Sequence, residues 1–301
     1  MNIAVSGASS FVGINIVEQL IIQYPEARIY ALVRPNSLNN KKLIKLKNKI
    51  CIVEIDMANM NALPTMIESL DVFYLNAWNG TRGNDRENEE LQRSNYKYTI
   101  EAINIAIGLG ANTIIGVGSQ AEYGIVEDEI EENHPTKPVS AYGKYKLKVF
   151  KDGLKICLKN NVNFKWGRIF SAYGADDNPN TLISYCVKNM LENKPINVSQ
   201  STQMWNYINI KDVAYFFAGM LSDCIPSGPY NISSDDTRVL KDYILEIKNT
   251  LESNSLINYG AIQNNIRLMN LIPNNSKLLK YFANYRFIPF SVGIREIVNK
   301  N

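Results

Sequence analysis

The first 24 residues of the chain combine a short apolar strand, a turn of small residues and an amphipathic helix. The apolar strand Ile3–Val5 precedes the turn Gly7-Ala-Ser-Ser-Phe-Val-Gly13, and the helical pattern runs from Ile14 to Tyr24. Small residues in such a turn let the backbone approach a pyrophosphate, and the N-terminus of the following helix favours its negative charge. The spacing is G-x-x-G-x-x-G with Ser10 at the middle glycine. A dinucleotide would contact Gly7, Ser9, Ser10, Phe11, Val12 and Gly13.

Strand-like and helix-like segments alternate from Met1 to about residue 175, which predicts a parallel sheet with helices on both faces. Beyond Gly174 the pattern is less regular and richer in Asn and Pro. We therefore expect an α/β fold with a doubly wound (Rossmann) sheet in a cofactor domain over 1–174, to which segments at roughly 200–225 return. A smaller α+β substrate lobe is expected over mainly 175–301. Strands are predicted near 2–5, 29–33, 50–55, 71–75, 113–117 and 163–169, and helices near 12–24, 87–108 and 140–160.

Tyr142 and Lys146 stand four residues apart in a predicted helix and so share one of its faces. A nearby ammonium favours phenolate, which would lower the pKa of Tyr142 from about 10 and let it exchange a proton with a sugar hydroxyl or ketone. Alone, the pair is also compatible with a solvated helix face.

Together, these features resemble the extended short-chain dehydrogenase/reductase family of nucleotide-sugar epimerases, dehydratases and reductases, through nearly the whole chain. The resemblance implies that Tyr142 and Lys146 act with Ser119, in Gly118-Ser-Gln-Ala-Glu-Tyr-Gly124, and with Asn95, which would support Lys146 through water. In such a site Tyr142 exchanges the proton, Ser119 stabilises the carbonyl oxygen, and Lys146 lowers the phenol pKa and binds the nicotinamide ribose.

The resemblance also implies further cofactor and substrate contacts. Asp56 and Met57 follow the third strand, where the family contacts adenine, and Asn76-Ala77-Trp78 forms a cofactor-lining turn after the fourth. Arg168-Ile-Phe-Ser-Ala-Tyr-Gly174 resembles the segment beside the nicotinamide, and Tyr230–Ile232 and Ser276-Lys277 resemble late motifs of the substrate half. Within these segments Phe170 and Ala172 are expected to touch cofactor, and Ser119, Gln120, Ser171, Asn180, Trp205 and Arg267 to touch substrate.

The end of the second strand predicts the cofactor. Ile29–Val33 is followed by Arg34-Pro-Asn-Ser37, and no Asp or Glu lies between Ala27 and Cys51. A carboxylate there would hold the ribose 2′-hydroxyl of NAD, whereas an arginine can pair with the 2′-phosphate of NADP. Arg34, with Ser37, therefore favours NADP over NAD, although a plain surface role for Arg34 stays open.

The residues after Ser119 help to distinguish among the reactions that the family catalyses. Dehydratases of the family carry an Asp-Glu pair directly after the catalytic Thr, and this chain has Gln120 and Ala121 there, which cannot transfer protons. Together with Arg34, the motif around Ser119 favours the reductases of 4-keto-6-deoxy nucleotide sugars, which serve deoxysugar and cell-surface polysaccharide biosynthesis. Two alternatives stay open: an NAD-dependent nucleotide-sugar 4-epimerase, and a non-catalytic regulator that senses NADP.

The substrate half departs from the family at Trp205, which stands where relatives often have a diphosphate-binding arginine. Trp205 could stack on the base, cover the sugar or pack within the lobe, and Arg267 is a substitute phosphate ligand by position. The nucleotide and the sugar stereochemistry are left open.

Composition excludes several other classes. The 301 residues are 46% hydrophobic with a net charge of +3, and no apolar run approaches the roughly 18 residues of a membrane helix. The run Lys41–Lys49 reads as a short surface helix, so neither nucleic acid nor membrane is expected as a partner. The only histidine, His134, precedes a proline and is expected to be exposed, which disfavours a metal site or a serine-histidine hydrolase. Four scattered cysteines are interpreted as reduced core thiols of a cytoplasmic protein: Cys51, Cys157, Cys186 and Cys224. The protein is expected to be a homodimer.

Overall fold

The computed structural model describes residues 1–262 and 269–300, which form two compact units. The chain crosses between them repeatedly, so neither unit is one continuous stretch. The return to the first unit, expected at roughly 200–225, lies at 213–232. Unit 1 contains residues 1–124, 132–169 and 213–232, and unit 2 contains residues 125–131, 170–212 and 233–301.

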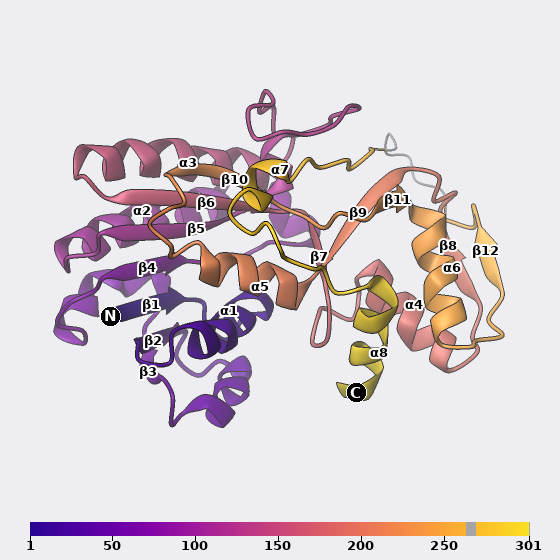
Figure 1. Ribbon diagram of the computed structural model, residues 1–301, viewed down its shortest axis with the longest axis horizontal. Coiled ribbons are helices and arrows are strands. Elements are labelled where there is room, and N and C mark those ends of the chain that lie inside the picture. The colour runs from indigo at the N-terminus through magenta and orange to yellow at the C-terminus, as the bar shows by residue number, and fades with distance from the viewer. Residues whose placement is uncertain (263–268, 301) are drawn as a thin grey trace. The chain divides into compact units, whose positions relative to one another are not determined.

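Unit 1 is built around a seven-stranded sheet in which every neighbouring pair of strands is parallel (Figure 1). The strand order β3-β2-β1-β4-β5-β6-β10 reverses between β1 and β4, and ligands bind doubly wound sheets at the carboxyl ends of strands beside such a reversal. The expected Rossmann-type sheet is therefore confirmed. Its strands are β1 (Asn2–Ser6), β2 (Arg28–Val33), β3 (Cys51–Glu54), β4 (Val72–Leu75), β5 (Thr113–Ser119), β6 (Asn163–Ile169) and β10 (Gly228–Ile232).

Helices cover both faces of this sheet because each presents an apolar stripe to it. The helices α2 (Glu89–Gly108) and α3 (Ala141–Lys159) pack side by side on one face, where Ile103 and Val149 are fully buried. The opposite face carries α1 (Phe11–Gln23) and α5 (Ile210–Gly219), and the Tyr74 hydroxyl there donates to the Phe217 carbonyl oxygen. Four 3₁₀ segments complete unit 1: η1 (Leu38–Leu46), η2 (Met57–Thr65), η3 (Gly83–Glu87) and η4 (Gln120–Glu122).

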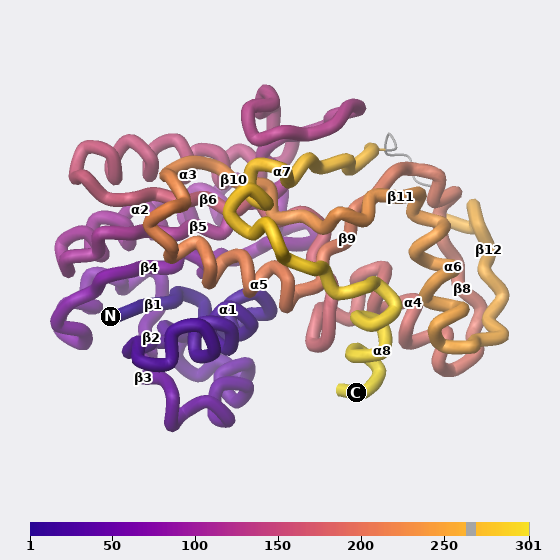
Figure 2. Tube along the Cα trace, viewed as in Figure 1, coloured from indigo at the N-terminus to yellow at the C-terminus, as the bar shows by residue number. Residues whose placement is uncertain are grey.

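Side-chain caps fix where the helices begin. The hydroxyl oxygens of Ser10 and Ser140 accept the N–H groups of Gly13 and Gly143, and Asn88 caps α2 in the same way. Such caps each contribute about 1 kcal/mol and satisfy N–H groups that have no partner within the helix. The chain enters the sheet at β1, in its middle, as the tube of Figure 2 shows.

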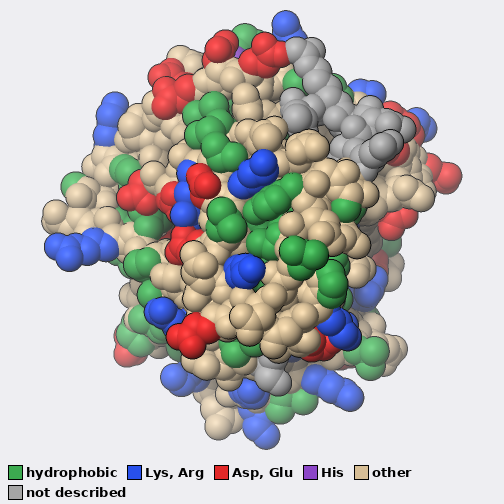
Figure 3. Space-filling view, turned by 90° about the vertical axis from the view of Figure 1, so that its right-hand side faces the viewer, with side chains coloured by type: hydrophobic (Ala, Val, Ile, Leu, Met, Phe, Trp, Pro, Cys, Tyr) green, Lys and Arg blue, Asp and Glu red, His purple; other side chains and the backbone are tan. Residues whose placement is uncertain are grey.

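Unit 2 combines two small sheets with helices. A three-stranded sheet has the order β11-β9-β7 and a two-stranded sheet pairs β12 with β8. Its core includes the fully buried Tyr243, Ile244 and Ile294. Figure 3 faces the side that carries α6 and β12, where hydrophobic side chains lie among charged ones. Leu245 of α6 and Leu256, just before β12, are exposed. The elements are β7 (Ser171–Tyr173), α4 (Leu182–Leu191), β8 (Ile196–Val198), β9 (Met204–Asn209), β11 (Thr237–Val239), α6 (Leu240–Thr250), β12 (Ile257–Tyr259), α7 (Ser276–Leu279) and α8 (Phe290–Lys300).

Three expectations from the sequence are wrong in detail. Tyr230–Ile232 is not part of the substrate half, because it pairs with β6 as an edge strand of the unit 1 sheet. His134 is half-buried, with its ring centre 6.4 Å from that of Tyr123. Cys224 is exposed rather than in the core. Along the described ranges, no helix combines the length and hydropathy needed to span a bilayer.

Candidate active site

The turn between β1 and α1 requires glycine at both of its ends. Gly7 has φ +63°, and a Cβ there would lie 2.9 Å from the Ala77 Cα. A Cβ on Gly13 would lie 2.2 Å from the Gly7 carbonyl oxygen. No other residue type fits at Gly13 without moving the backbone, so the turn keeps the close approach that a dinucleotide pyrophosphate needs.

Asn76, at the end of β4, holds this turn in place. Its Nδ2 donates to the Gly7 carbonyl oxygen and to the Ser10 Oγ, both at 3.0 Å. The Ser10 Oγ also accepts the Gly13 N–H at 3.1 Å. Because the Ser10 hydroxyl accepts from two N–H groups, its own proton is available to an anion at the helix N-terminus. This arrangement fits the pyrophosphate of a nicotinamide dinucleotide.

The remaining expected contacts of the adenosine side lie in unit 1 around the ends of β2 and β3. Arg34 is exposed directly after β2, and Ser37 is half-buried at the start of η1. Asp56 follows β3, and its Oδ1 accepts the Ala58 N–H at 2.9 Å, which caps η2. In the turn itself Ser9 is buried and Phe11 and Val12 are half-buried, as is Met57 after β3.

Tyr142 lies in the first turn of α3 with its side chain buried. The Trp78 ring meets it edge-on with 6.1 Å between ring centres, and the Arg86 guanidinium lies 4.5 Å from its ring centre. Burial raises the pKa of Tyr142 above its usual 10, while a hydrogen bond with Ser119 and the charge of Arg86 act to lower it. The expected net lowering of this pKa is therefore wrong: burial outweighs the nearby charges, and the phenol keeps its proton.

Lys146 is held one helical turn further on and is also buried. Its Nζ donates to the Val117 carbonyl oxygen at 2.8 Å and lies 4.0 Å from the centre of the Trp78 ring. Burial lowers the pKa of Lys146 to about 7, and the negative charge of Glu122 acts against that shift. The Lys146 side chain is therefore cationic below a pH of about 7 and neutral above it.

Asn95 forms hydrogen bonds with the main chain of the turn after β4, which also carries Trp78. Its Nδ2 donates to the Asn79 carbonyl oxygen at 2.8 Å, and its Oδ1 accepts the Asn79 N–H at 3.1 Å. From the same helix, Gln92 accepts the Trp78 indole N–H at 2.7 Å. Asn95 thus holds Asn79, and Gln92 holds Trp78, which lies over Lys146. The support of Lys146 by Asn95 through water stays a prediction. Sequence reasoning missed Gln92, which stands one turn before Asn95.

Ser119 ends β5 and caps η4. Its Oγ accepts the Ala121 N–H at 3.2 Å, and its own N–H donates to Oε1 of the fully buried Glu122 at 2.8 Å. The hydrogen bond with Ser119 that lowers the pKa of Tyr142 joins the two hydroxyl-bearing side chains of the site. Sequence reasoning also missed the role of Glu122, although Ser119 and Glu122 have the S-x-x-E spacing of a capping box.

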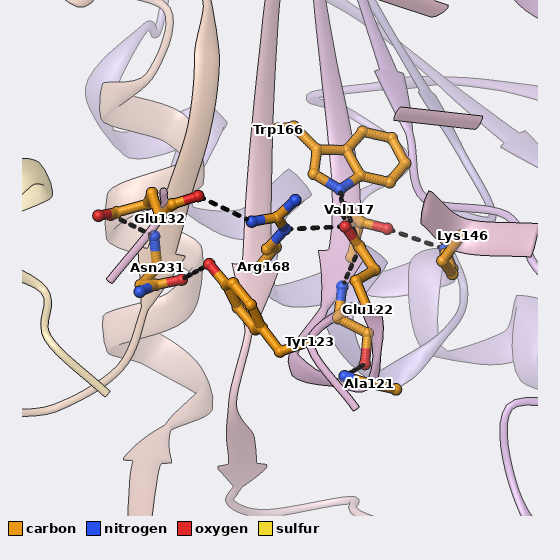
Figure 4. Close-up of polar contacts among 10 residues, drawn as sticks. Val117, Ala121, Glu122, Tyr123, Glu132, Lys146, Trp166, Arg168 and Asn231 are labelled. Carbon is orange, nitrogen blue, oxygen red and sulfur yellow. Dashed lines mark hydrogen bonds and ion pairs between the residues drawn. The ribbon is translucent and has the colours of Figure 1, made fainter. Parts of the chain in front are cut away.

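Figure 4 shows that Arg168 lies beside Glu122. Arg168 is 2% exposed, and its Nε donates to the Glu122 Oε2 at 2.8 Å. Gln120, expected to touch substrate, is half-buried in η4 of the same unit.

Other expected substrate and nicotinamide residues belong to unit 2. Phe170 is buried, Ser171 and Ala172 lie in β7, and Asn180 is exposed. Trp205 is half-buried in β9, and its buried indole N–H meets no hydrogen-bond acceptor in the described part of the chain. Arg267 lies outside the described residues.

Comparisons with known proteins agree with this fold. The profile of the NAD dependent epimerase/dehydratase family matches residues 3–249. CDP-abequose synthase of Salmonella muenchen is 30% identical over 97 residues, which cover 32% of this chain and 33% of that enzyme. The match thus spans about a third of the curated relative's length.

Two solved structures illustrate the similarity of fold. The dTDP-glucose 4,6-dehydratase of Bacillus anthracis, in complex with NAD, has a TM-score of 0.85 at 20% identity and covers 100% of this chain and 96% of its own. The UDP-N-acetylglucosamine 4-epimerase of Methanobrevibacter ruminantium has a TM-score of 0.87 at 18% identity, with 99% and 97% covered. Because the family profile covers well over half of its residues, this chain belongs to the NAD-dependent epimerase/dehydratase family of enzymes, as its sequence motifs predicted.

Proposed function

We propose that this protein is an NADPH-dependent reductase of a keto group, most simply C4, in a nucleotide-linked 4-keto-6-deoxy sugar. The observation that carries the proposal is the grouping of Ser119, Tyr142 and Lys146. Tyr142 is hydrogen-bonded to Ser119, is buried, and has a raised pKa, so it stays protonated at neutral pH. A general acid needs its proton at the working pH.

The residues divide the work of the reduction. NADPH, when bound in the turn Gly7–Gly13, supplies hydride to the keto carbon. Tyr142 donates its phenolic proton to the alkoxide oxygen that forms. The Ser119 hydroxyl hydrogen-bonds the same oxygen while negative charge develops on it. Lys146 supports the phenolate left on Tyr142 with its positive charge, and Asn95 holds the turn of Trp78, which packs over Lys146.

The choice of NADP rests on Arg34. It is exposed at the carboxyl end of β2, and the sequence from Arg28 to Ile50 contains no carboxylate to hold a ribose 2′-hydroxyl. Exposure leaves its guanidinium available to a 2′-phosphate.

The choice of reduction over dehydration rests on Gln120 and Ala121, because neither side chain can serve as the acid or base that removal of water requires. The similarity to CDP-abequose synthase supports a nucleotide-linked sugar as the substrate class. Trp205, with its unpartnered indole N–H, is proposed to contact the nucleotide or the sugar. The proposal includes a cytoplasmic homodimer that serves deoxysugar biosynthesis.

The experiment is a panel of CDP-, dTDP-, GDP- and UDP-linked 4-keto-6-deoxy sugars, each mixed with the protein and NADPH while NADPH absorbance is followed. At least one should cause stoichiometric NADPH oxidation, and NADH should serve poorly. Protein that carries bound NAD on purification and interconverts 4-epimers without added cofactor would instead identify a 4-epimerase. Binding of NADPH without any turnover across the panel would favour the sensor.

A further inference from the structure

The candidate site contains a buried carboxylate to which the proposed chemistry gives no role. Glu122 is fully buried in η4, only three residues after Ser119. Its Oε1 accepts the Ser119 N–H at 2.8 Å and the Trp166 indole N–H at 2.9 Å, and its Oε2 accepts from Arg168 Nε at 2.8 Å. A carboxylate is costly to bury unless donors surround it, and here three donors converge on one group.

The strands around Glu122 are built to hold it. Trp166 and Arg168 project from β6, and the Trp166 ring fits against β5 because Gly116 and Gly118 lack side chains. A Cβ on Gly116 would lie 2.1 Å from the Trp166 ring, and one on Gly118 would lie 2.2 Å from its indole nitrogen. Figure 4 shows the resulting group, with the carboxylate between Trp166 and Arg168.

Arg168 is itself fixed from the other side. Its guanidinium donates to the Glu132 carbonyl oxygen at 3.3 Å and lies 4.5 Å from the Tyr123 ring centre. The Glu132 side chain accepts the Asn231 N–H at 2.8 Å, and Tyr123 donates to Asn231 at 2.6 Å. This chain of contacts links β5, β6 and β10 and leaves the Glu122 carboxylate little freedom to move.

We propose that Glu122 is a positioning residue: its carboxylate fixes the main chain of Ser119, and its charge helps keep Lys146 cationic. The first half follows from geometry, because the two hydrogen bonds of a capping box join Ser119 and Glu122 reciprocally. The proposal rests on the proposed function only where it assigns Ser119 and Lys146 to the reaction.

The second half follows from the geometry around Lys146, whose Nζ lies 6.0 Å from the centre of the Trp166 ring, while the Trp166 indole N–H donates to the Glu122 Oε1 at 2.9 Å. Glu122 is thus a buried negative charge close to Lys146, and that charge raises the pKa of Lys146, which burial lowers. Arg168 neutralises Glu122 from the far side but is not among the causes of this shift. The other ionisable groups near the site face Tyr142 or its helix: Arg82 and Arg86 act on Tyr142, and Glu87 accepts the Ala141 N–H at 3.3 Å.

Two substitutions of Glu122 test the positioning half and the electrostatic half of the proposal separately. Glu122→Gln keeps the length of the side chain and an acceptor for the Ser119 N–H but removes the charge. Glu122→Asp keeps the charge but is one methylene too short to keep the Ser119 contact. Lys165→Met is the matched control, because Lys165 is also a fully buried cation of β6 but donates to Met220 and Ser222 instead.

The first readout needs neither substrate nor cofactor. Trp78 and Trp166 both lie near the Lys146 ammonium, 4.0 and 6.0 Å from their ring centres, so the tryptophan fluorescence of a Trp205→Phe background should change with a midpoint near pH 7, and Lys146→Met should abolish that change. Glu122→Gln should move the midpoint to lower pH, whereas Glu122→Asp and Lys165→Met should leave it in place. An unmoved midpoint in Glu122→Gln overturns the electrostatic half.

The second readout is turnover. Glu122→Asp should lower kcat by roughly 10- to 100-fold with little change in KM, since a displaced Ser119 loses transition-state stabilisation. Full kcat in Glu122→Asp overturns the positioning half. Absence of reductase activity in the wild type contradicts the proposed function alone, because the fluorescence midpoint is still measurable.

A variant with an unpaired Arg168 could fail to fold, so Glu122→Gln is also combined with Arg168→Gln. The double variant removes both charges of the Glu122–Arg168 pair, and circular dichroism tests whether it folds. Its midpoint should still lie below that of the wild type, because the charge of Glu122 raises the pKa of Lys146. A wild-type midpoint in a folded double variant overturns the electrostatic half.

Discussion

The ammonium of Lys146 lies 4.0 Å from the centre of the Trp78 ring while donating to the Val117 carbonyl oxygen. This contact joins α3, the end of β5 and the turn after β4 at the site. Gln92 and Asn95 hold the turn from α2, so the position of Lys146 depends on four elements. The cation–π contact with Trp78 favours the charged form that burial opposes.

Tyr142→Phe tests the general acid. The variant keeps the ring that packs against Trp78 and Arg86 but has no proton to donate. Turnover should fall by roughly 10²–10⁴-fold, with little change in KM, because the hydroxyl acts mainly at the transition state. Steady-state kinetics measures both constants. Tyr145→Phe, on the same helix, is the control and should keep wild-type kcat.

The pH profile tests Lys146. Its pKa is lowered to about 7, so the side chain is cationic below that pH and neutral above it. The raised pKa keeps Tyr142 protonated across the same range. The value of kcat/KM for ketone reduction should therefore fall as pH rises through about 7. Lys148→Met removes an exposed lysine of α3 and should leave the profile unchanged. A flat profile from pH 6 to 9 would show that the charge of Lys146 is not required.

Arg34→Ala tests the cofactor preference. NADPH should bind the wild type more tightly than NADH by about 1.5 kcal/mol, the lower end for a charged hydrogen bond, since Arg34 is exposed to screening salt. The substitution should remove most of that difference in calorimetry. Lys41→Ala removes an exposed cation from the following segment and should preserve it. Equal affinities of the wild type for the two cofactors would contradict the assignment.

Gly13→Ala tests the dinucleotide turn. The added methyl group would meet the Gly7 carbonyl oxygen at 2.2 Å, so the turn must open. We expect loss of NADPH binding and a destabilisation of about 1–3 kcal/mol in denaturant unfolding, as for overpacked sites. Gly108→Ala meets nothing within 4 Å and is the matched control, with binding and stability close to wild type.

The sequence predicted unit 1 well because its periodic patterns are local. The strands and helices expected up to residue 169 lie within two residues of those observed. The strand Gly228–Ile232 was not placed in the sheet, since its assignment depends on pairing with β6 rather than on its own short pattern. Similarly, the partners of Glu122 come from β6, 44 and 46 residues along the chain, and no spacing rule brings Trp166 and Arg168 to it.

The pKa of Tyr142 shows why the electrostatics of the site did not follow from sequence. Spacing placed Lys146 on the same helix face correctly, but the depth of burial of both side chains depends on Trp78 and on strand β5. Desolvation then reverses the expected direction of the Tyr142 shift. The substrate contacts proposed for unit 2 were harder to predict, because the chain has Trp205 where the family resemblance implies a diphosphate-binding arginine.

Hydride transfer is the central claim, and one isotope measurement tests it directly. The protein is incubated with the nucleotide-linked 4-keto-6-deoxy sugar that oxidises NADPH in the panel, using NADPH deuterated at the transferred position of the nicotinamide ring. The account predicts a product with one deuterium, bonded to C4, which the Tyr142→Phe variant forms roughly 10²–10⁴-fold more slowly. A product without deuterium at C4 would contradict reduction by NADPH at this site.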